Sequence, residues 1–519
     1  MLAEGTLVER FLNLRELTYR NDSVQILSQE ELSECARLFS VNYGMYRAES
    51  PIRPGQQIKM SETYYKKNYC RDDYYVARAF YKDTLIGQAF YVRISVEDAR
   101  YITWVVQLVV DKDYRGNHIG STLLNSIWCF SDDIAWGLAT ANPCTIKALE
   151  AATLRRCEVK EIGKRITLID QIRELIPFAK DADLRISERE AIIQSKFFVD
   201  NSQYGNIEEI EKKLGILEPG DEWLCFTFFD QKLDKELCKK YMDTFFESSK
   251  EQVYSAYDRM PMQTHAWTKG TENEISFILD WMRGNGQTDD GKIDSVLDLG
   301  CGDGRHLKAL ASQIGYGIGV DSAKTHIENA DDNRSRNLGF FNEDAGDLQF
   351  ANKFSVVLCL YDVYGSFARN SENDRILETA YSNLEKGGYL FLSAMNKDLT
   401  LDLLPKTQYF DLQESPEKPI YLKPGKIMQE SGNIFDPAYL LYDEHMDIFY
   451  HKEQFDNDCG LRAEYVIRDR RYTAKELEQA LQAIGFSVQY VAYVQAGHFD
   501  LPLDKLDQKA KEILVVARK

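Results

Sequence analysis

Hydrophobic and polar residues alternate along the first part of the chain in a way that predicts strands. The pattern covers residues 73–81, 84–94 and 101–110, which are rich in Tyr, Val and Phe. Alternation with a period of two is typical of half-buried strands. We therefore expect an antiparallel meander, then a helix over 119–130, a strand over 134–140, a helix over 145–156 and a strand over 222–229.

The second part of the chain has a different pattern, in which short apolar runs alternate with helical segments. The apolar runs are 296–299, 317–320, 354–360 and 389–392, and the predicted helices include 305–313, 373–384 and 474–484. Strands that alternate with helices form a largely parallel sheet covered on both faces. The predicted fold class is α/β with two domains: a mixed sheet, then a doubly wound Rossmann-like sheet with a small inserted lid.

The length of the chain requires more than one core. Domains contain roughly 100 to 200 residues, and this chain has 519. We place the first domain at 1–240 and the second at 250–519, with the boundary in the polar stretch 230–250. Residues 166–217 are predicted to be a mainly helical insertion in the first domain, or an extension of it. Residues 424–469 are predicted to be an inserted lid of the second domain.

Charge and cysteine content narrow the function classes. The net charge of −19 offers no general attraction for phosphate backbones. The 10 cysteines form no CxxC pair and no Cys/His metal spacing, and no apolar segment indicates export or membrane insertion. We expect a cytoplasmic protein with reduced thiols and no bound metal, and neither a membrane nor DNA nor RNA as a partner. The oligomeric state stays open.

A glycine-rich turn follows the first apolar run of the second domain. The strand and turn together read VLDLGCGDG over residues 296–304. A dinucleotide-binding turn needs the spacing GxGxxG, but Arg305 stands where its last glycine would be. The spacing therefore disfavours NAD.

This turn resembles motif I of the class I S-adenosylmethionine (SAM) methyltransferases, and further motifs of that family follow in order over 250–519. The resemblance implies that the glycine loop lies against the methionine part of SAM, with Asp298 near its amino group. It also implies that Asp321 binds the ribose diol and that Asp344 and Ala345 lie at the adenine. The implied SAM-binding residues are Asp298, Gly300, Gly302, Gly304, Asp321, Asp344, Ala345 and Leu360.

The carboxyl end of the strand 354–360 is expected to deliver residues to the substrate, because ligands of open α/β sheets bind at that edge. Asp362 is the first candidate for orienting or deprotonating an acceptor amine, and Tyr361 lies beside it. In related methyltransferases the segment before the first sheet helix folds over cofactor and substrate, which adds His265 as a third candidate. Thr271 and Glu274 predict a capping box at the start of that helix.

A second glycine loop lies in the first domain, between the strand 101–110 and the helix 119–130. A helix start presents unpaired N–H groups and a positive dipole end to an anion. The loop resembles motif A of the GNAT acyltransferases, which holds the pyrophosphate of coenzyme A. The resemblance implies acetyl-CoA, or another acyl-CoA, as a second cofactor. The implied acyl-CoA residues are Leu108, Val110, Arg115, Gly116, Asn117, His118, Ile119, Gly120, Ser121 and Asn142.

Two departures from the GNAT pattern leave the activity of the first domain open. His118 stands where the family prefers the middle glycine of the motif. The helix 145–156 also lacks the tyrosine that many members use as general acid for the departing thiolate. Glu150 on that helix could serve as a base, but an exposed helix carboxylate is the plainer interpretation.

The combined prediction is a SAM-dependent methyltransferase that modifies nitrogen or oxygen of a small molecule or amine, fused to a GNAT-type N-acetyltransferase domain. DNA-base methylation is not expected, because residues 250–519 contain neither an (Asp/Asn)-Pro-Pro-(Tyr/Phe) step nor a Pro-Cys pair. One alternative is that the GNAT-like domain is a non-catalytic sensor or scaffold. A second alternative is modification of RNA or protein termini, against which the acidic charge argues.

Overall fold

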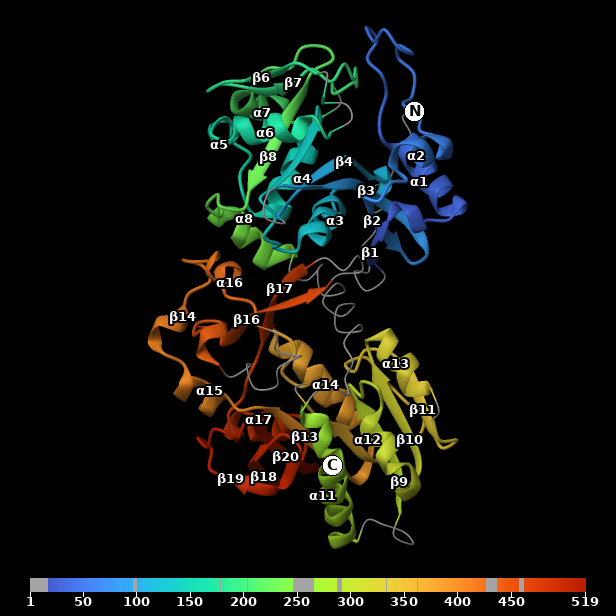
Figure 1. The fold of residues 1–519 in the computed structure, drawn as a ribbon. Coiled ribbons are helices and arrows are strands. Elements are labelled where there is room, and N and C mark those ends of the chain that lie inside the picture. Colours follow the sequence, from blue (N-terminus) through green and yellow to red (C-terminus); the bar gives the residue numbers. More distant parts are fainter. Residues whose placement is uncertain are drawn as a thin grey trace, which may run out of the picture. The chain divides into compact units, whose positions relative to one another are not determined.

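The computed structural model describes residues 17–96, 100–176, 179–180, 182–202, 204–245, 266–286, 292–332, 334–361, 363–425, 436–456 and 462–519. The chain divides into two compact units. The first is formed by Met1–Val253 and Asp456–Ala463, and the second by Tyr254–Phe455 and Glu464–Lys519. Both are drawn in Figure 1.

A mixed 8-stranded sheet organises the first unit, in the order β1-β2-β3-β4-β5-β8-β7-β6. β2, β3 and β4 form the predicted antiparallel meander, and β5 then lies parallel to β4. The strands are Leu17–Ser23 (β1), Tyr74–Tyr81 (β2), Thr84–Ser95 (β3), Tyr101–Val110 (β4), Ala135–Thr140 (β5), Leu184–Ile186 (β6), Ala191–Ile193 (β7) and Glu222–Phe228 (β8).

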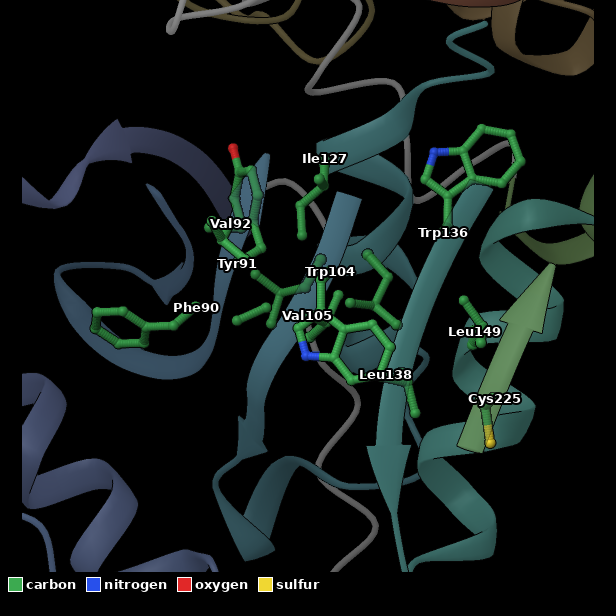
Figure 2. Packing of buried hydrophobic residues seen from close by; sticks show 14 of the residues in the cluster. Phe90, Tyr91, Val92, Trp104, Val105, Ile127, Trp136, Leu138, Leu149 and Cys225 are labelled. Carbon is green, nitrogen blue, oxygen red and sulfur yellow. The ribbon is translucent and has the colours of Figure 1, made fainter. Parts of the chain in front are cut away.

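Large aromatic side chains fill the core of this unit. Trp104 of β4 and Trp136 of β5 are buried there (Figure 2). A Cβ atom at Gly137 would lie 2.5 Å from the ring of Phe226 and 2.8 Å from that of Trp104, so the packing requires glycine at this position. The helices are Gln29–Asn42 (α1), Glu62–Tyr69 (α2), Ile119–Trp128 (α3), Pro143–Thr153 (α4), Val159–Gly163 (α5), Ile166–Arg173 (α6), Ile207–Leu214 (α7) and Lys235–Lys240 (α8).

Residues 166–217 differ from the mainly helical prediction. They contain α6 and α7, but also the antiparallel pair β6 and β7. β7 pairs with β8 and so extends the sheet of the first unit. Each of the two strands is only 3 residues long, too short for an alternating pattern to appear in the sequence.

The second unit is built on another 8-stranded sheet, in the order β11-β10-β9-β12-β13-β20-β18-β19. β11, β10, β9, β12 and β13 are parallel, and β20 runs antiparallel to β13. This arrangement confirms the predicted α/β class. The strands are Ile293–Leu299 (β9), Ile314–Asp321 (β10), Leu338–Asn342 (β11), Phe354–Cys359 (β12), Leu384–Met395 (β13), Ser487–Gln495 (β18), His498–Leu503 (β19) and Glu512–Arg518 (β20).

A smaller sheet is inserted between β13 and the last helix. Its 4 strands lie in the order β14-β15-β16-β17, and β15, β16 and β17 fall within the predicted lid, whereas β14 precedes it. They are Tyr409–Phe410 (β14), Leu440–Asp443 (β15), Ile448–Asp456 (β16) and Arg462–Asp469 (β17). The helices of this unit are Thr271–Gly284 (α11), Arg305–Leu310 (α12), Lys324–Asp331 (α13), Asn370–Asn383 (α14), Lys397–Leu403 (α15), Lys418–Tyr421 (α16) and Ala474–Ile484 (α17). Over the described parts of both units, every helix is too short or too polar to cross a membrane.

Candidate functional site

The glycine loop connects β9 to α12 at the carboxyl end of the strand. Gly300, Gly302 and Gly304 have φ values of 71°, 54° and 75°, in the left-handed region that favours glycine. A Cβ atom at Gly300 would lie 2.3 Å from a methyl group of Val363, and one at Gly304 would lie 2.6 Å from the ring of Phe340. Both the backbone angle and the available space therefore require glycine at positions 300 and 304.

Asp321 ends the neighbouring strand β10 and is fastened beside the glycine loop. Its Oδ2 accepts a hydrogen bond from Gly302 N at 2.8 Å, and its Oδ1 accepts one from Ala323 N at 2.9 Å. A carboxylate oxygen can accept more than one hydrogen bond. The carboxylate is thus held rigidly and can still accept hydrogen bonds from a vicinal diol.

The next strand end, that of β11, carries the residues predicted to lie at the adenine. Asn342 Nδ2 donates to Asp321 O at 3.0 Å, which ties this strand end to that of β10. Asp344 Oδ1 accepts from Gly346 N at 2.7 Å and forms a tight turn, in which Ala345 is half-buried. The sheet edge therefore places Asp298, Asp321 and Asp344 on successive strands or the turns after them.

Asp298 lies within β9, just before the loop, and is almost fully buried. Its Oδ2 accepts no hydrogen bond from the described residues and lies 3.8 Å from Nδ1 of His306, a buried imidazole whose pKa is lowered by burial. Burial raises the pKa of Asp298 to about 7, despite the nearby charge of Arg305. A buried carboxyl group with an unpartnered oxygen fits a cationic donor such as an ammonium group.

A buried ionic cluster stands beside Asp298. Glu274 of α11 is fully buried, and its Oε2 accepts from Arg305 Nη1 at 2.7 Å and lies 2.8 Å from His306 Nε2. The Tyr361 hydroxyl donates to the other oxygen, Oε1. Burial raises the pKa of Glu274, but the hydrogen bonds from His306 and Arg305 outweigh it and hold the net pKa below its usual value. Arg305 Nη2 is buried without a hydrogen-bond partner among the described residues.

Tyr361 follows β12 and brings the cluster to the carboxyl edge of the sheet. Its φ of 62° is unusual for a residue other than glycine, and such strain concentrates at functional sites. Its hydroxyl accepts from Gly497 N at 3.0 Å, and its own N donates to Ser393 Oγ at 2.8 Å. The preceding Leu360 is buried. Hydrogen bonds at the backbone amide and at the side-chain hydroxyl group thus hold Tyr361 in its strained conformation.

In the first unit, the loop after β4 is fixed mainly by Arg115. Its Nε donates to Val110 O at 3.2 Å, and its Nη2 donates to Asn42 O. Gly116 has a φ of 84°, and His118 takes a left-handed φ of 61° before α3 begins. The guanidinium therefore shapes the loop through backbone carbonyl groups, and His118 adopts a left-handed conformation that favours glycine.

The start of α3 has the arrangement of an anion site. Ser121 Oγ donates to His118 O at 2.8 Å, and Asn117 Nδ2 donates to Tyr114 O at 3.1 Å. Ile119 is buried, whereas Gly120 is half-buried and borders β4. The first N–H groups of a helix have no intrahelical acceptor and favour an anion.

Strands β4 and β5 separate near this loop. Their parallel pairing runs from Ile102 to Val105 on β4 and ends at Leu138 on β5. Among the described residues, Leu108 and Val110, farther along β4, pair with β3 but not with β5. Val110 O on this edge is occupied by Arg115 Nε, so the part of the β4 edge without a β5 partner lies between Val105 and Val110.

Two family models match this chain. The model of the acetyltransferase (GNAT) family matches residues 42–130, and that of a methyltransferase domain matches residues 296–388. The chain carries a GNAT domain and a methyltransferase domain. The two matches contain the two glycine loops, one in each unit.

Known methyltransferases resemble part of this chain. The dTDP-3-amino-3,6-dideoxy-alpha-D-glucopyranose N,N-dimethyltransferase of Streptomyces fradiae is 31% identical over 87 residues, which are 17% of this chain and 34% of that protein. The CcbJ methyltransferase of Streptomyces caelestis is 15% identical with a TM-score of 0.36, over 51% of this chain and 97% of its own. The amino pentose methyltransferase CalS10 of Micromonospora echinaspora, solved with SAM bound, is 17% identical with a TM-score of 0.31, over 52% and 97%.

Two predicted residues of the GNAT domain have structural partners. Asn142 caps α4, because its Oδ1 accepts from Cys144 N at 2.9 Å. Glu150 is buried, where an exposed carboxylate was the plainer prediction. Its Oε1 accepts from Cys157 N at 2.9 Å and from Lys213 Nζ. These contacts give Glu150 a structural role in the packing of α4. They do not support a role as a free base.

In the methyltransferase domain, the catalytic candidates Asp362 and His265 lie outside the described residues. The capping-box prediction is wrong: α11 is capped by Gly270, and Glu274 turns inward to the ionic cluster. Sequence reasoning missed this role, although Glu274, Ile278 and Met282 recur at helical spacing on the buried face of α11. A carboxylate on such a face requires a cationic partner.

Binding of the methionine part of SAM is expected to depend on pH through Asp298. Because its pKa is raised to about 7 in the ligand-free structure, the carboxyl group is largely protonated below pH 7. An ammonium ligand favours the carboxylate, so binding below pH 7 must release a proton. Affinity for S-adenosylhomocysteine should therefore fall about tenfold per pH unit below pH 7. Calorimetry in buffers of different ionisation enthalpy measures the released proton; an affinity that is flat from pH 5.5 to 8 contradicts the assignment.

Proposed function

We propose that the protein is a SAM-dependent methyltransferase of small-molecule amines whose GNAT domain binds an acyl-CoA. The observation that carries the first part is the glycine loop after β9, together with Asp321 on the adjacent strand end. The strand order reverses between β9 and β12, and ligands of open α/β sheets bind at that switch point. The site therefore lies where this fold class places its ligands.

The charges of the site match each part of SAM. Asp321 would bind the ribose diol, and the turn at Asp344 and Ala345 would lie at the adenine. Asp298 would meet the methionyl ammonium group, and Arg305 Nη2, which is buried without a partner among the described residues, would meet the methionyl carboxylate. Bound SAM supplies an electrophilic methyl group. The residues of the chain bind and orient the cofactor, and the strained Tyr361 faces the substrate side.

An amine acceptor is supported by a separate line of evidence. The Streptomyces fradiae relative, which is 31% identical over 87 residues, methylates an amino group of a nucleotide-linked deoxysugar. The test is transfer of radiolabelled methyl from SAM to a panel of amino sugars, each paired with its hydroxyl counterpart. Label on the amine and not on its counterpart supports N-methylation. Label on hydroxyl compounds only would overturn the amine assignment.

In the GNAT domain, the start of α3 and the free edge of β4 favour acyl-CoA as the ligand. The pyrophosphate would lie on the helix N-terminus, and the pantetheine amides would pair with the edge of β4 beyond Val105. α4 contains no tyrosine, and Glu150 is engaged by Lys213 and Cys157. These features support the alternative in which the domain binds acyl-CoA as a sensor or scaffold without transferring the acyl group.

Replacing Gly120 with tryptophan is expected to abolish acyl-CoA binding. A Cβ atom at Gly120 would make ordinary contacts, 3.7 Å from Val110 and 3.8 Å from Leu108, so Gly120→Ala fits and serves as the matched control. The tryptophan ring, in contrast, must project into the space beside β4 and the helix start. Calorimetry with acetyl-CoA should show a loss of about 100-fold in affinity for Gly120→Trp and none for Gly120→Ala. Equal affinity in both variants would place the pyrophosphate elsewhere.

A further inference from the structure

A buried carboxyl group lies at the same sheet edge as the proposed cofactor residues, farther along the sheet. Glu512 is the first residue of β20 and pairs with Met395, the last residue of β13. Because β20 is antiparallel to β13, its first residue lies at the carboxyl end of β13. The glycine loop and Asp321 follow the carboxyl ends of β9 and β10 in the same parallel set.

Glu512 has an unsatisfied oxygen in this buried position. The residue is 7% exposed, and its Oε2 has no hydrogen-bond partner among the described residues. Ser393 of β13 is near Glu512, whose pKa it lowers, and its Oγ accepts a hydrogen bond from Tyr361 N at 2.8 Å. The hydrogen bond that fixes the backbone after β12 therefore lies next to Glu512. An unpartnered buried oxygen costs free energy that a ligand donor would recover.

Two charged groups face Glu512. They are Glu274 of α11 and Arg471, which precedes α17. Arg471 is itself buried and engaged, because its Nε lies 3.3 Å from Asp469 Oδ1 and its Nη1 donates to Thr400 Oγ1 at 3.0 Å. Burial raises the pKa of Glu512 to about 7, with Glu274 adding to the rise and Arg471 opposing it. This carboxyl group therefore exchanges a proton close to neutral pH.

The strand order indicates which part of the ligands lies near Glu512. In the proposed function the adenine lies over β11, the ribose over β10 and the methionyl group beside β9. The sheet continues from β9 through β12 and β13 to β20. In the proposed function, this direction along the sheet leads from the cofactor towards the methyl acceptor. In this placement Glu512 and Tyr361 would lie on the acceptor side of the cofactor.

We propose that Glu512 binds the amine of the methyl acceptor and takes up its proton, an inference that rests on the proposed function. The acceptor enters as an ammonium ion at neutral pH. One N–H bond breaks, an O–H bond forms on Glu512, and the electron pair stays on nitrogen, ready for the methyl group that bound SAM supplies. Glu512 then gives its proton to solvent. The ligand class assigned to this end of the site is a primary or secondary amine.

The test uses the full-length protein and two SAM analogues, so it does not depend on knowing the acceptor. Sinefungin carries an ammonium group on a carbon in place of the methylated sulfur, whereas S-adenosylhomocysteine is neutral there. At pH 8, wild type is expected to bind sinefungin about tenfold more tightly than S-adenosylhomocysteine, because a buried carboxylate faces the added charge. Glu512→Gln should remove this preference and leave the affinity for S-adenosylhomocysteine within about twofold of wild type.

Glu222→Gln is the matched control. Glu222 is also 7% exposed, and burial likewise raises its pKa to about 7, but it belongs to the other unit. Its substitution should leave the sinefungin preference intact. An unchanged preference in Glu512→Gln, or an equal loss of both ligands, would overturn the role of Glu512 while the proposed function stands. Failure of wild type to bind either analogue would overturn both.

Discussion

Replacing Asp321 with alanine is expected to weaken the binding of S-adenosylhomocysteine about 100-fold, or about 2.8 kcal/mol. The carboxylate would lose its hydrogen bonds to the ribose diol, which are charge-assisted and therefore stronger than neutral ones. The substitution would also remove the hydrogen bond that Gly302 N donates to Asp321 Oδ2 at 2.8 Å, so the glycine loop would lose an anchor. Calorimetric titration measures the loss directly.

A control separates this effect from a general change in charge. Asp331 lies at the end of α13 in the same unit, and its side chain is 51% exposed in a pair with Arg334. Asp331→Ala should leave both the affinity and the melting temperature unchanged. If Asp321→Ala binds S-adenosylhomocysteine as tightly as wild type does, the ribose contact is assigned to the wrong residue.

Replacing Glu274 with alanine is expected to destabilise the methyltransferase unit by about 3–5 kcal/mol. The substitution leaves the half-buried Arg305 without its carboxylate and removes the acceptor of the Tyr361 hydroxyl group. An uncompensated buried charge is among the costliest single changes in a protein. Denaturant unfolding measures the loss of stability. A chain with two units need not unfold in one step, so the transition of the methyltransferase unit is identified as the one that S-adenosylhomocysteine shifts.

Two further variants make this result specific. Glu272 is exposed on the same helix, so Glu272→Ala should change stability by less than about 0.5 kcal/mol. Glu274→Gln keeps the shape of the side chain and should lose less than alanine does. Equal stability of Glu274→Ala and Glu272→Ala would mean that the cluster contributes nothing to the fold.

The parts of the site that could be predicted from sequence are those set by short-range constraints. The glycines at 300, 302 and 304 occur together because a strand must turn sharply into a helix, and the structure shows left-handed φ values at all three. Asp321 ends an apolar run, which already places it at a strand end. Alternation of apolar runs with helical segments likewise predicted the α/β sheet that the structure confirms.

The missed residues depend on partners that are distant in sequence. Glu274 follows Thr271 at the spacing of a capping box, but its partner Arg305 lies 31 positions away, beyond the reach of any local pattern. Glu512 is the first residue of the buried strand β20 and lies at the carboxyl end of β13 only because these two strands pair. In the first unit, β6 and β7 are too short to give a periodic signal and are held by β8.

The central claim is that the glycine loop of the second unit binds SAM, and calorimetric titration of the full-length protein with S-adenosylhomocysteine tests it most directly. Asp321→Ala and Asp331→Ala are titrated beside wild type. The account predicts saturable binding of one ligand per chain, lost in the first variant and kept in the second. Absence of binding to a wild-type protein with intact circular dichroism and a cooperative unfolding transition would contradict it.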